Sequence, residues 1–310
     1  MSSDRYMHNR REFLKLLAAA GAGVALPGLA AATGSEQILK AIPSSGEKLP
    51  VVGLGTSRVF EVGPSEEERE GPMQVLEALA RVPNSMMDTS PMYGSAESVV
   101  GDLAARLGVR DRLFFATKVW IEGRERGIAQ MQQSMRRLRT DRLDLIQVHN
   151  LVDTRTHLQT LRQWKQEGRV RYLGITHYHA GAHDSLMRVM QREPLDFVQV
   201  NYSLVEPGAQ QRLLPLAREK GIAIIANRPF ARGELFRLTR GKPLPPWAQE
   251  LGIASWAQYF LKFVVSHPAV TVAIPGTSKV KHMLDNQQAG RGVLPDAAMR
   301  ERMFRYLQNI

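Results

Sequence analysis

The 310-residue chain contains no cysteine. This absence excludes disulfide bonds, thiolate metal sites and thiol catalysis, although it fits any cellular compartment. The remaining composition, with 44% hydrophobic and 23% charged residues, is that of an ordinary globular protein with a full core. A chain of this length forms either one large α/β barrel or two ordinary domains.

The chain also lacks a concentrated basic segment, despite its formal net charge of +11. Such a surplus of positive charge suggests an anionic partner. The basic residues are spread over many expected helices, so we do not expect nucleic acid to be that partner. The composition instead predicts a solvated basic surface together with a pocket for a phosphorylated ligand.

The apolar segment near the N-terminus is short. The uncharged residues 16–32 are too few and too rich in Gly and Ala to predict stable membrane insertion. They follow Asn-Arg-Arg-Glu-Phe-Leu-Lys at residues 9–15, which resembles a twin-arginine export signal, and they end in a small-residue cleavage pattern. The resemblance implies that residues 1–32 are a signal peptide for the twin-arginine translocation machinery and that the mature protein is periplasmic. An uncleaved anchor and an untargeted helix remain alternatives.

From residue 38 onward, short apolar stretches alternate with amphipathic ones. The expected strands are residues 49–56, 85–88, 113–119, 143–149, 172–176, 197–201, 223–226 and 270–274. The expected helices are residues 73–82, 95–107, 127–138, 157–167, 182–192, 209–220, 255–266 and 280–288. Short apolar strands between amphipathic helices indicate a parallel sheet buried on both faces. Eight such units predict an α/β fold, a single-domain (β/α)8 TIM barrel over residues 38–310.

No Gly-x-Gly-x-x-Gly turn follows the first expected strand. This absence weighs against the alternative architecture, an open doubly wound sheet. No internal segment is rich enough in Gly, Ser or Pro to divide the chain into two domains. The proline-containing residues 241–246 form a loop, because both of their flanks continue the same alternation.

Three consecutive expected strands end in ionisable side chains, namely Asp88, Lys118 and His149. Tyr93 follows Asp88 in the next loop. The carboxyl ends of barrel strands meet at the face where active sites are built, so we expect these four side chains to lie together. A phenol, with an ordinary pKa of about 10, donates a proton near neutral pH more readily when a neighbouring cation lowers that pKa. Lys118 would supply the cation.

The order of these motifs resembles the aldo-keto reductase superfamily over residues 38–290. The matching motifs are Gly53-Leu54-Gly55-Thr56, Asp88-Thr89 with Tyr93-Gly94, Thr117-Lys118, Gln147-Val148-His149, Gln199-Val200-Asn201-Tyr202 and Ile274-Pro275-Gly276-Thr277. The resemblance implies an oxidoreductase that reduces aldehydes or ketones by hydride transfer from NADPH. In that family pattern Tyr93 is the general acid, Lys118 lowers the phenol's pKa and Asp88 holds Lys118 charged. His149 would orient the carbonyl.

Elementary chemistry agrees with this assignment. Hydride addition to a carbonyl develops negative charge on oxygen, and a positioned proton donor beside a cation stabilises that charge. The cofactor supplies the hydride. The reaction needs no metal, and we expect none.

The same resemblance implies cofactor contacts at the strand ends. Thr56 and Asp88 match positions that line the ribose and nicotinamide, and Gln199 matches the carboxamide contact. The family usually has Ser-Asn where this chain has Thr176-His177, and it often has a stacking tyrosine where this chain has Asn227. The next residue, Arg228, is expected to contact the pyrophosphate, because arginine pairs well with phosphate.

Residues 274–286 resemble the family's adenosine 2′-phosphate loop, where backbone donors and a helix dipole face an anion. Cofactor contacts are expected there from Gly276, Thr277, Ser278, Lys279, His282 and Asn286. The family commonly has arginine at the position of His282, and a histidine is only partly charged near neutral pH. We therefore expect a modest preference for NADPH, with NADH possible.

Side chains in the same loops are expected to line the substrate pocket, namely Phe60, Met92, Trp120 and Val152. About 20 residues follow the last expected barrel helix, so the site should be open to a small carbonyl substrate. We expect a monomer. Some members of this superfamily sense the cofactor instead of turning it over, so the alternative function is an exported nucleotide-binding sensor.

Overall fold

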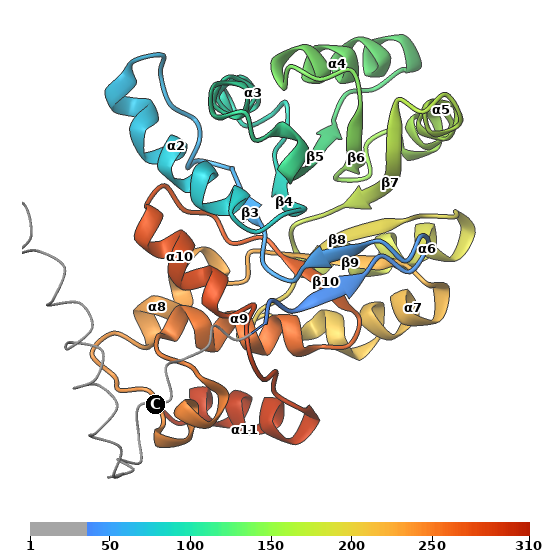
Figure 1. The fold of residues 1–310 in the computed structure, drawn as a ribbon. Helices are drawn as coiled ribbons and strands as arrows, with labels where there is room; N and C mark the ends of the chain where they lie inside the picture. Colours follow the sequence, from blue (N-terminus) through green and yellow to red (C-terminus); the bar gives the residue numbers. More distant parts are fainter. Residues whose placement is uncertain (1–35) are drawn as a thin grey trace, which may run out of the picture. The chain divides into compact units, whose positions relative to one another are not determined.

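The computed structural model describes residues 36–310, and the expected signal peptide lies outside these residues. In the described part of the chain, eight parallel strands form one sheet in sequence order (Figure 1). They are β3 (Leu54–Gly55), β4 (Ser85–Asp88), β5 (Leu113–Val119), β6 (Leu143–His149), β7 (Val170–Thr176), β8 (Phe197–Asn201), β9 (Ala223–Asn227) and β10 (Val270–Ala273). Parallel bridges from Val52 to Ala273 and from Gly55 to Gly276 connect the two edges. The predicted (β/α)8 barrel is therefore confirmed, in a nearly closed form.

Helices follow the strands and surround the sheet (Figure 1). The barrel helices are α2 (Glu66–Ala80), α3 (Ala96–Leu107), α4 (Arg124–Arg137), α5 (Thr154–Gln166), α6 (His183–Arg192), α7 (Leu213–Lys220), α9 (Trp256–Ser266) and α10 (Val280–Gln288). Their ends follow local chemistry. The Ser65 hydroxyl accepts a hydrogen bond from the Glu68 N–H at the start of α2, and Gly108 ends α3 in the left-handed conformation.

Two further helices lie outside the repeated strand–helix unit. The short α8 (Glu234–Leu238) lies within the long connection between β9 and α9. The last helix, α11 (Ala297–Gln308), packs against α9, and the Tyr259 hydroxyl donates to the Met303 carbonyl oxygen at 2.9 Å. The residues after the last barrel helix therefore form a packed helix on the outside of the barrel.

The first expected strand, residues 49–56, was wrong as a single element. Its beginning forms β2 (Lys48–Pro50), which pairs antiparallel with β1 (Leu39–Ala41) in a hairpin. Ile42 and Leu49 of this hairpin lie in the cluster of buried residues at the barrel's N-terminal end, so the hairpin closes that end. Between β2 and β3, a Cβ atom on Gly53 would lie 2.5 Å from the Met86 carbonyl oxygen, so only glycine fits there.

The side chains inside the barrel change from apolar to polar along the strands. Every second residue of a strand faces the interior. On β5, Phe114 and Ala116 belong to the apolar cluster inside the barrel, and the next inward position is Lys118. On β6, Leu145 belongs to the same cluster and is followed by Gln147 and His149. The C-terminal end of the barrel is therefore polar above an apolar floor, which positions the site.

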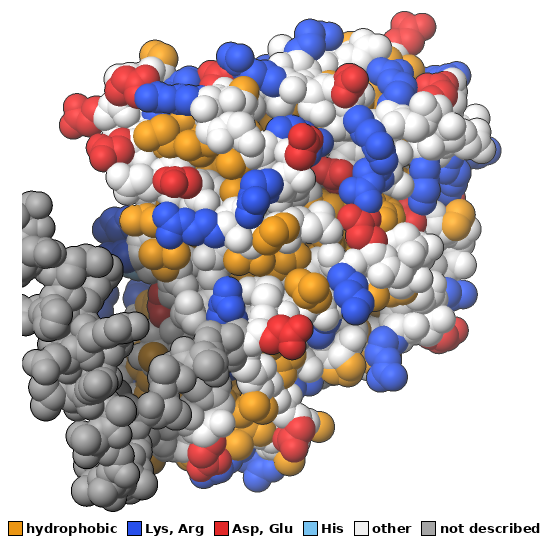
Figure 2. All heavy atoms as spheres, in the orientation of Figure 1, with side chains coloured by type: hydrophobic (Ala, Val, Ile, Leu, Met, Phe, Trp, Pro, Cys, Tyr) orange, Lys and Arg blue, Asp and Glu red, His pale blue; other side chains and the backbone are white. Residues whose placement is uncertain are grey.

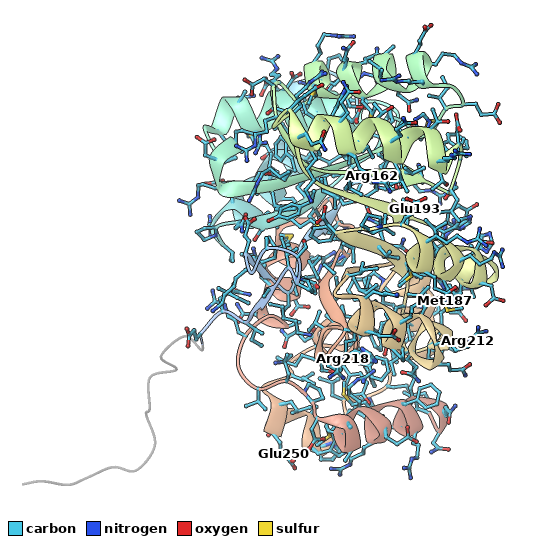
Figure 3. All side chains as sticks on the ribbon, turned by 90° about the vertical axis from the view of Figure 1, so that its right-hand side faces the viewer. Arg162, Met187, Glu193, Arg212, Arg218 and Glu250 are labelled. Carbon is cyan, nitrogen blue, oxygen red and sulfur yellow. The ribbon has the colours of Figure 1, made fainter. Side chains whose placement is uncertain are left out.

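The outer surface carries mixed charges. Figure 2 shows basic side chains lying among acidic and apolar ones over this face. Figure 3 shows Arg162 on α5 beside Glu193, with which it forms an ion pair that links α5 to the end of α6. Exposed pairs of this kind contribute little stability, typically about 0–1 kcal/mol. Among residues 36–310, no helix combines the length and the apolar character that crossing a membrane requires.

Candidate active site

Asp88 and Lys118 form a buried ion pair at the C-terminal ends of β4 and β5. The Lys118 Nζ lies 2.6 Å from Asp88 Oδ2, and it also donates to the Thr89 carbonyl oxygen at 2.7 Å. The relative exposure is 0% for Lys118 and 2% for Asp88. Such a buried pair persists only when further hydrogen bonds satisfy the remaining polar atoms.

Two glutamines supply those hydrogen bonds from the opposite side of the carboxylate. Asp88 Oδ1 accepts from Gln147 Nε2 at 3.1 Å and from Gln199 Nε2 at 2.8 Å. Gln199 Oε1 in turn accepts from Thr176 Oγ1 at 3.1 Å and from Asn227 Nδ2 at 3.3 Å. A polar network thus connects the C-terminal ends of six neighbouring strands, β4 to β9.

Tyr93 lies beside this pair, in the loop after β4. Lys118 Nζ is 5.1 Å from the centroid of the Tyr93 ring. Burial raises the pKa of Tyr93 above its ordinary value, and this outweighs the lowering by the charge of Lys118. The expectation of a lowered phenol pKa was therefore wrong in its net sign, although Lys118 acts in the expected direction. The phenol is protonated at neutral pH, as a proton donor must be.

Lys118 keeps its charge in spite of its burial. Burial lowers the pKa of Lys118, but the charge of Asp88, the nearby Tyr93 phenol and hydrogen bonds to both raise it more, so its pKa is higher than usual. A positive ammonium group therefore lies next to the Tyr93 ring at neutral pH.

His149 ends β6 as a half-buried side chain on the same face. Burial, followed by the charges of Lys118 and His177, lowers its pKa to about 3. The imidazole is therefore neutral near pH 7, with one N–H donor and one acceptor. Its ring lies at 90° to the Tyr93 ring, with a centroid distance of 6.3 Å, and 5.9 Å from the Trp120 ring.

Several expected cofactor residues lie at neighbouring strand ends. Thr56 is buried and donates from Oγ1 to the Asp88 carbonyl oxygen at 3.0 Å. The His177 N–H donates to the Gln199 carbonyl oxygen at 3.0 Å, which holds the loop after β7 against β8. Arg228 follows β9 with a positive φ of 51°, and its guanidinium lies 4.3 Å from the centroid of the Tyr178 ring.

The loop from β10 to α10 forms a second group of expected cofactor residues. Gly276 lies against the first strand, where a Cβ atom would be 3.2 Å from the Gly55 carbonyl oxygen. Thr277 Oγ1 accepts from the Lys279 N–H at 3.1 Å, just before α10 begins. Ser278, Lys279 and His282 are exposed, whereas Asn286 is buried.

His282 carries less charge than an ordinary histidine. Partial desolvation of the imidazole, followed by the charges of Lys281 and Lys279, lowers its pKa. Its neighbour Asp285 accepts hydrogen bonds from Ser255 at 2.7 Å and Gln258 at 2.6 Å. Asp285 therefore connects α10 to α9.

A match to the Aldo/keto reductase family spans residues 51–302, on the eight-stranded barrel just described. The chain belongs to the aldo/keto reductase family. This aldo-keto reductase is 30% identical over 257 residues to the methylglyoxal reductase YeaE of Escherichia coli (strain K12), covering 80% of this chain and 88% of that protein. The enzyme is therefore an oxidoreductase of a family of NADP-dependent carbonyl reductases, as the sequence predicted.

Solved structures agree. The reductase resembles a Klebsiella pneumoniae aldo/keto reductase in complex with NADP and acetate, with 26% identity, a TM-score of 0.70, and coverage of 84% and 93% of the two chains. A second K. pneumoniae enzyme, in complex with NADPH, is 25% identical with a TM-score of 0.73 and coverage of 88% and 95%. A twin-arginine translocation signal matches residues 7–27, which confirms the predicted export signal of a folded protein.

The four expected pocket residues of the reductase differ in exposure. Met92 and Trp120 are exposed by 43% and 38%, and Val152 is half-buried. Phe60 has no exposed surface and belongs to the hydrophobic core. Phe60 therefore presents no surface to a substrate in this structure, because its side chain packs inward beneath the loop after β3.

Sequence reasoning gave no role to Gln147 and Asn227, which belong to the polar network of the reductase. The alternation of inward-facing and outward-facing side chains along a strand could have identified both residues. Gln147 lies two residues before His149 on β6, and Asn227 lies two residues after the inward-facing Ile225 on β9, so both face the interior. Among the described residues, no group of three or more His, Asp or Glu side chains is arranged to hold a metal ion.

Proposed function

We propose that this aldo-keto reductase reduces small aldehydes or ketones with NADPH and uses Tyr93 as the general acid. The observation that carries the proposal is the Asp88–Lys118 pair, 2.6 Å long and fully enclosed, beside the Tyr93 ring. A neutral His149 lies beside the same phenol, with its ring at 90° to the Tyr93 ring. A proton donor, a cation and a neutral hydrogen-bonding group are what carbonyl reduction needs.

Each residue would have a separate role in the reaction. NADPH supplies a hydride to the carbonyl carbon when it is bound. The C=O π electrons move to oxygen, and the Tyr93 hydroxyl gives its proton to that oxygen, so the product is an alcohol. Lys118 stabilises the phenolate that remains, and Asp88 holds Lys118 in place. The neutral His149 donates a hydrogen bond that orients the carbonyl.

The residues at the strand ends fit a nicotinamide nucleotide. Asn227 Oδ1 and Asn201 Nδ2 are buried and have no hydrogen-bond partner among the described residues. A primary carboxamide offers a donor and an acceptor, the complement of these two atoms. Gln199 keeps one N–H for the same group. Thr56 and Asp88 would line the ribose and nicotinamide, Thr176 and His177 would hydrogen-bond the amide, and Arg228 would pair with the pyrophosphate.

The adenosine end would lie at the start of α10. Backbone N–H groups of Gly276 to Ser278 and the helix dipole favour an anion there. Lys279 would meet the 2′-phosphate and Asn286 the adenine. The lowered pKa of His282 leaves it largely neutral, so we propose a modest preference for NADPH, with NADH also accepted.

The twin-arginine signal supports a periplasmic location for the mature enzyme, since that machinery exports folded proteins. We propose that residues 38–310 work there as a monomer on a small carbonyl substrate. The competing function is a nucleotide-binding sensor that turns over slowly or not at all.

The test is the variant Tyr93→Phe, assayed by NADPH oxidation with a panel of aldehydes and ketones that includes methylglyoxal. We expect kcat to fall roughly 10²–10⁴-fold, because the phenol donates its proton only in the chemical step. Nucleotide affinity should stay within about twofold, since the phenyl ring remains. Tyr178→Phe is the matched control, because it removes an exposed hydroxyl and keeps the ring that Arg228 covers.

The outcomes separate the two functions. A Tyr93→Phe enzyme within a few-fold of the parent would reject Tyr93 as the acid. A parent enzyme that binds NADPH tightly and reduces no compound of the panel would favour the sensor.

A further inference from the structure

Gln147 is a polar side chain buried deep in the barrel. It lies on β6 between Ile146 and Val148, which belong to the outer hydrophobic core, and its relative exposure is 0%. Its Nε2 donates to Asp88 Oδ1 at 3.1 Å. Its Oε1 is buried and has no hydrogen-bond partner among the described residues. A buried polar group with an unsatisfied oxygen costs stability, so packing alone gives no reason for a glutamine at this position.

The barrel leaves space for this contact. In the β6–β7 register, the residue opposite Gln147 is Gly174, which has no side chain to enter the interior. A Cβ atom on Gly174 would lie 2.5 Å from the Phe197 carbonyl oxygen. Gln147 from β6 and Gln199 from β8 therefore both reach across to the same carboxylate oxygen of Asp88.

We propose that Gln147 is a positioning residue, whose amide holds the Asp88 carboxylate with its second oxygen turned toward Lys118. The inference rests on the proposed function, because Asp88 and Lys118 support Tyr93 in that reaction. Because Oδ1 of Asp88 accepts from both glutamines, Oδ2 of Asp88 is left to accept from Lys118, at 2.6 Å. Without Gln147, one donor remains, and the carboxylate can rotate away from the ammonium group.

Loss of the hydrogen bond from Gln147 to Asp88 has a predictable effect on the pKa of Lys118. Burial lowers the pKa of Lys118, and the charge of Asp88 is the largest influence that raises it. A loosely held Asp88 therefore lets the pKa of Lys118 fall. The alkaline limb of the kcat profile then moves to lower pH, because the charged ammonium group is lost earlier.

The experiment compares Gln147→Leu and Gln147→Met with the parent reductase. Both variants remove the donor and the unsatisfied oxygen, and the methionine keeps the length of the side chain. We expect kcat to fall roughly tenfold, since hydrogen bonds to charged groups are worth at least that factor. KM for the aldehyde and Kd for NADPH should stay within about twofold, and Tm should stay close to that of the parent.

Gln147→Glu tests the geometry by rescue. Two carboxyl groups about 3 Å apart share one proton at low pH, which restores a hydrogen bond to Asp88. This variant should approach parental kcat at acidic pH and lose it as pH rises. Gln287→Leu is the matched control, because Gln287 is also buried but donates to the Ala78 carbonyl oxygen between α10 and α2. It should change Tm and leave kcat unchanged.

A second readout needs no turnover. A lysine whose pKa is raised in the folded state contributes stability that is complete below its unfolded pKa and is lost as pH rises through the folded pKa. In Gln147→Met this alkaline loss of stability should be smaller and should end at lower pH than in the parent, because only the folded pKa of Lys118 changes. The measurement applies even when the parent reduces no carbonyl, so failure of the proposed function is distinguished from failure of this inference.

Unchanged kcat and an unchanged alkaline stability profile in Gln147→Met would overturn the positioning role. A fall in Tm with kcat unchanged would also overturn it, because that pattern belongs to a purely structural residue. If Gln147→Leu does not fold, Gln147→Met and Gln147→Glu decide the question.

Discussion

The energetic coupling between Asp88 and Lys118 can be measured by removing each partner and then both. Asp88→Asn keeps the shape of the side chain and removes its charge, so it leaves the Lys118 ammonium group uncompensated. Lys118→Met keeps most of the aliphatic stem and leaves the carboxylate uncompensated. The side chains are exposed by 3% and 0%, so water cannot replace the missing partner.

The burial of the pair sets the expected magnitude. Removing one partner of a buried pair typically costs about 3–5 kcal/mol, because the remaining charge stays desolvated. For a domain of this size, about 2–4 °C of Tm accompanies each kcal/mol, so each single variant should lose roughly 6–20 °C. The double variant leaves no unpaired charge and should be less destabilised than the sum of the two single variants.

Thermal unfolding at pH 7 measures the three variants and the parent in one cycle. The control is Asp184→Asn, which breaks the exposed Arg212–Asp184 pair and should cost less than about 1 kcal/mol. All three site variants should also lose most carbonyl reduction. If the two single effects add in the double variant to within about 0.5 kcal/mol, the residues are not coupled and the reasoning fails.

Three further changes test other parts of the enzyme. The pKa of His149, about 3, lies below the ordinary 6.5, so its contribution to stability is complete above pH 6.5 and is lost as pH falls toward 3. In His149→Asn, Tm should therefore fall less steeply at acidic pH than in the parent. An equally steep fall in the variant would contradict the claim that burial lowers the pKa of His149. His282→Arg should tighten NADPH binding roughly tenfold and leave NADH unaffected, because a phosphate gains a permanent charge partner. If His282→Arg and the parent have equal dissociation constants for NADPH, residue 282 does not face the 2′-phosphate. Changing Arg10 and Arg11 to Lys should keep the protein in the cytoplasm on cell fractionation, and unchanged periplasmic delivery would reject the signal.

Local patterns were sufficient to predict most of the barrel. Strands such as Leu113–Val119 and Leu143–His149 are short, mostly apolar segments with a charged or ionisable residue at or next to their last position, and their bounds were predicted correctly. The first strand was different, because residues 49–56 form one mostly apolar run that divides between two sheets. That division depends on pairing with Leu39–Ala41 and on the close approach of Gly53 to Met86, and neither is visible in a local run of sequence.

The residues of the site were easier to predict than their electrostatics. Asp88, Lys118 and His149 end neighbouring strands, so the order of the strands and the alternation of side chains along them predict that the three lie together. The net shift in the pKa of Tyr93 depends on how completely the loop after β4 covers the phenol, which is a property of packing. For the same reason Phe60, in the loop after β3, was expected in the pocket and lies in the core.

Burial of Lys118 acts on the site in two opposite ways. The low dielectric of the barrel interior disfavours an ammonium group, and a lone lysine there would lose its proton. The same low dielectric strengthens its attraction to Asp88 at 2.6 Å. The balance favours the charged form only while the carboxylate stays in place, which is why the donors on the far oxygen of Asp88 matter. The polar layer therefore acts as one unit, and a change that admits water to it should weaken the pair and the support of Tyr93 together.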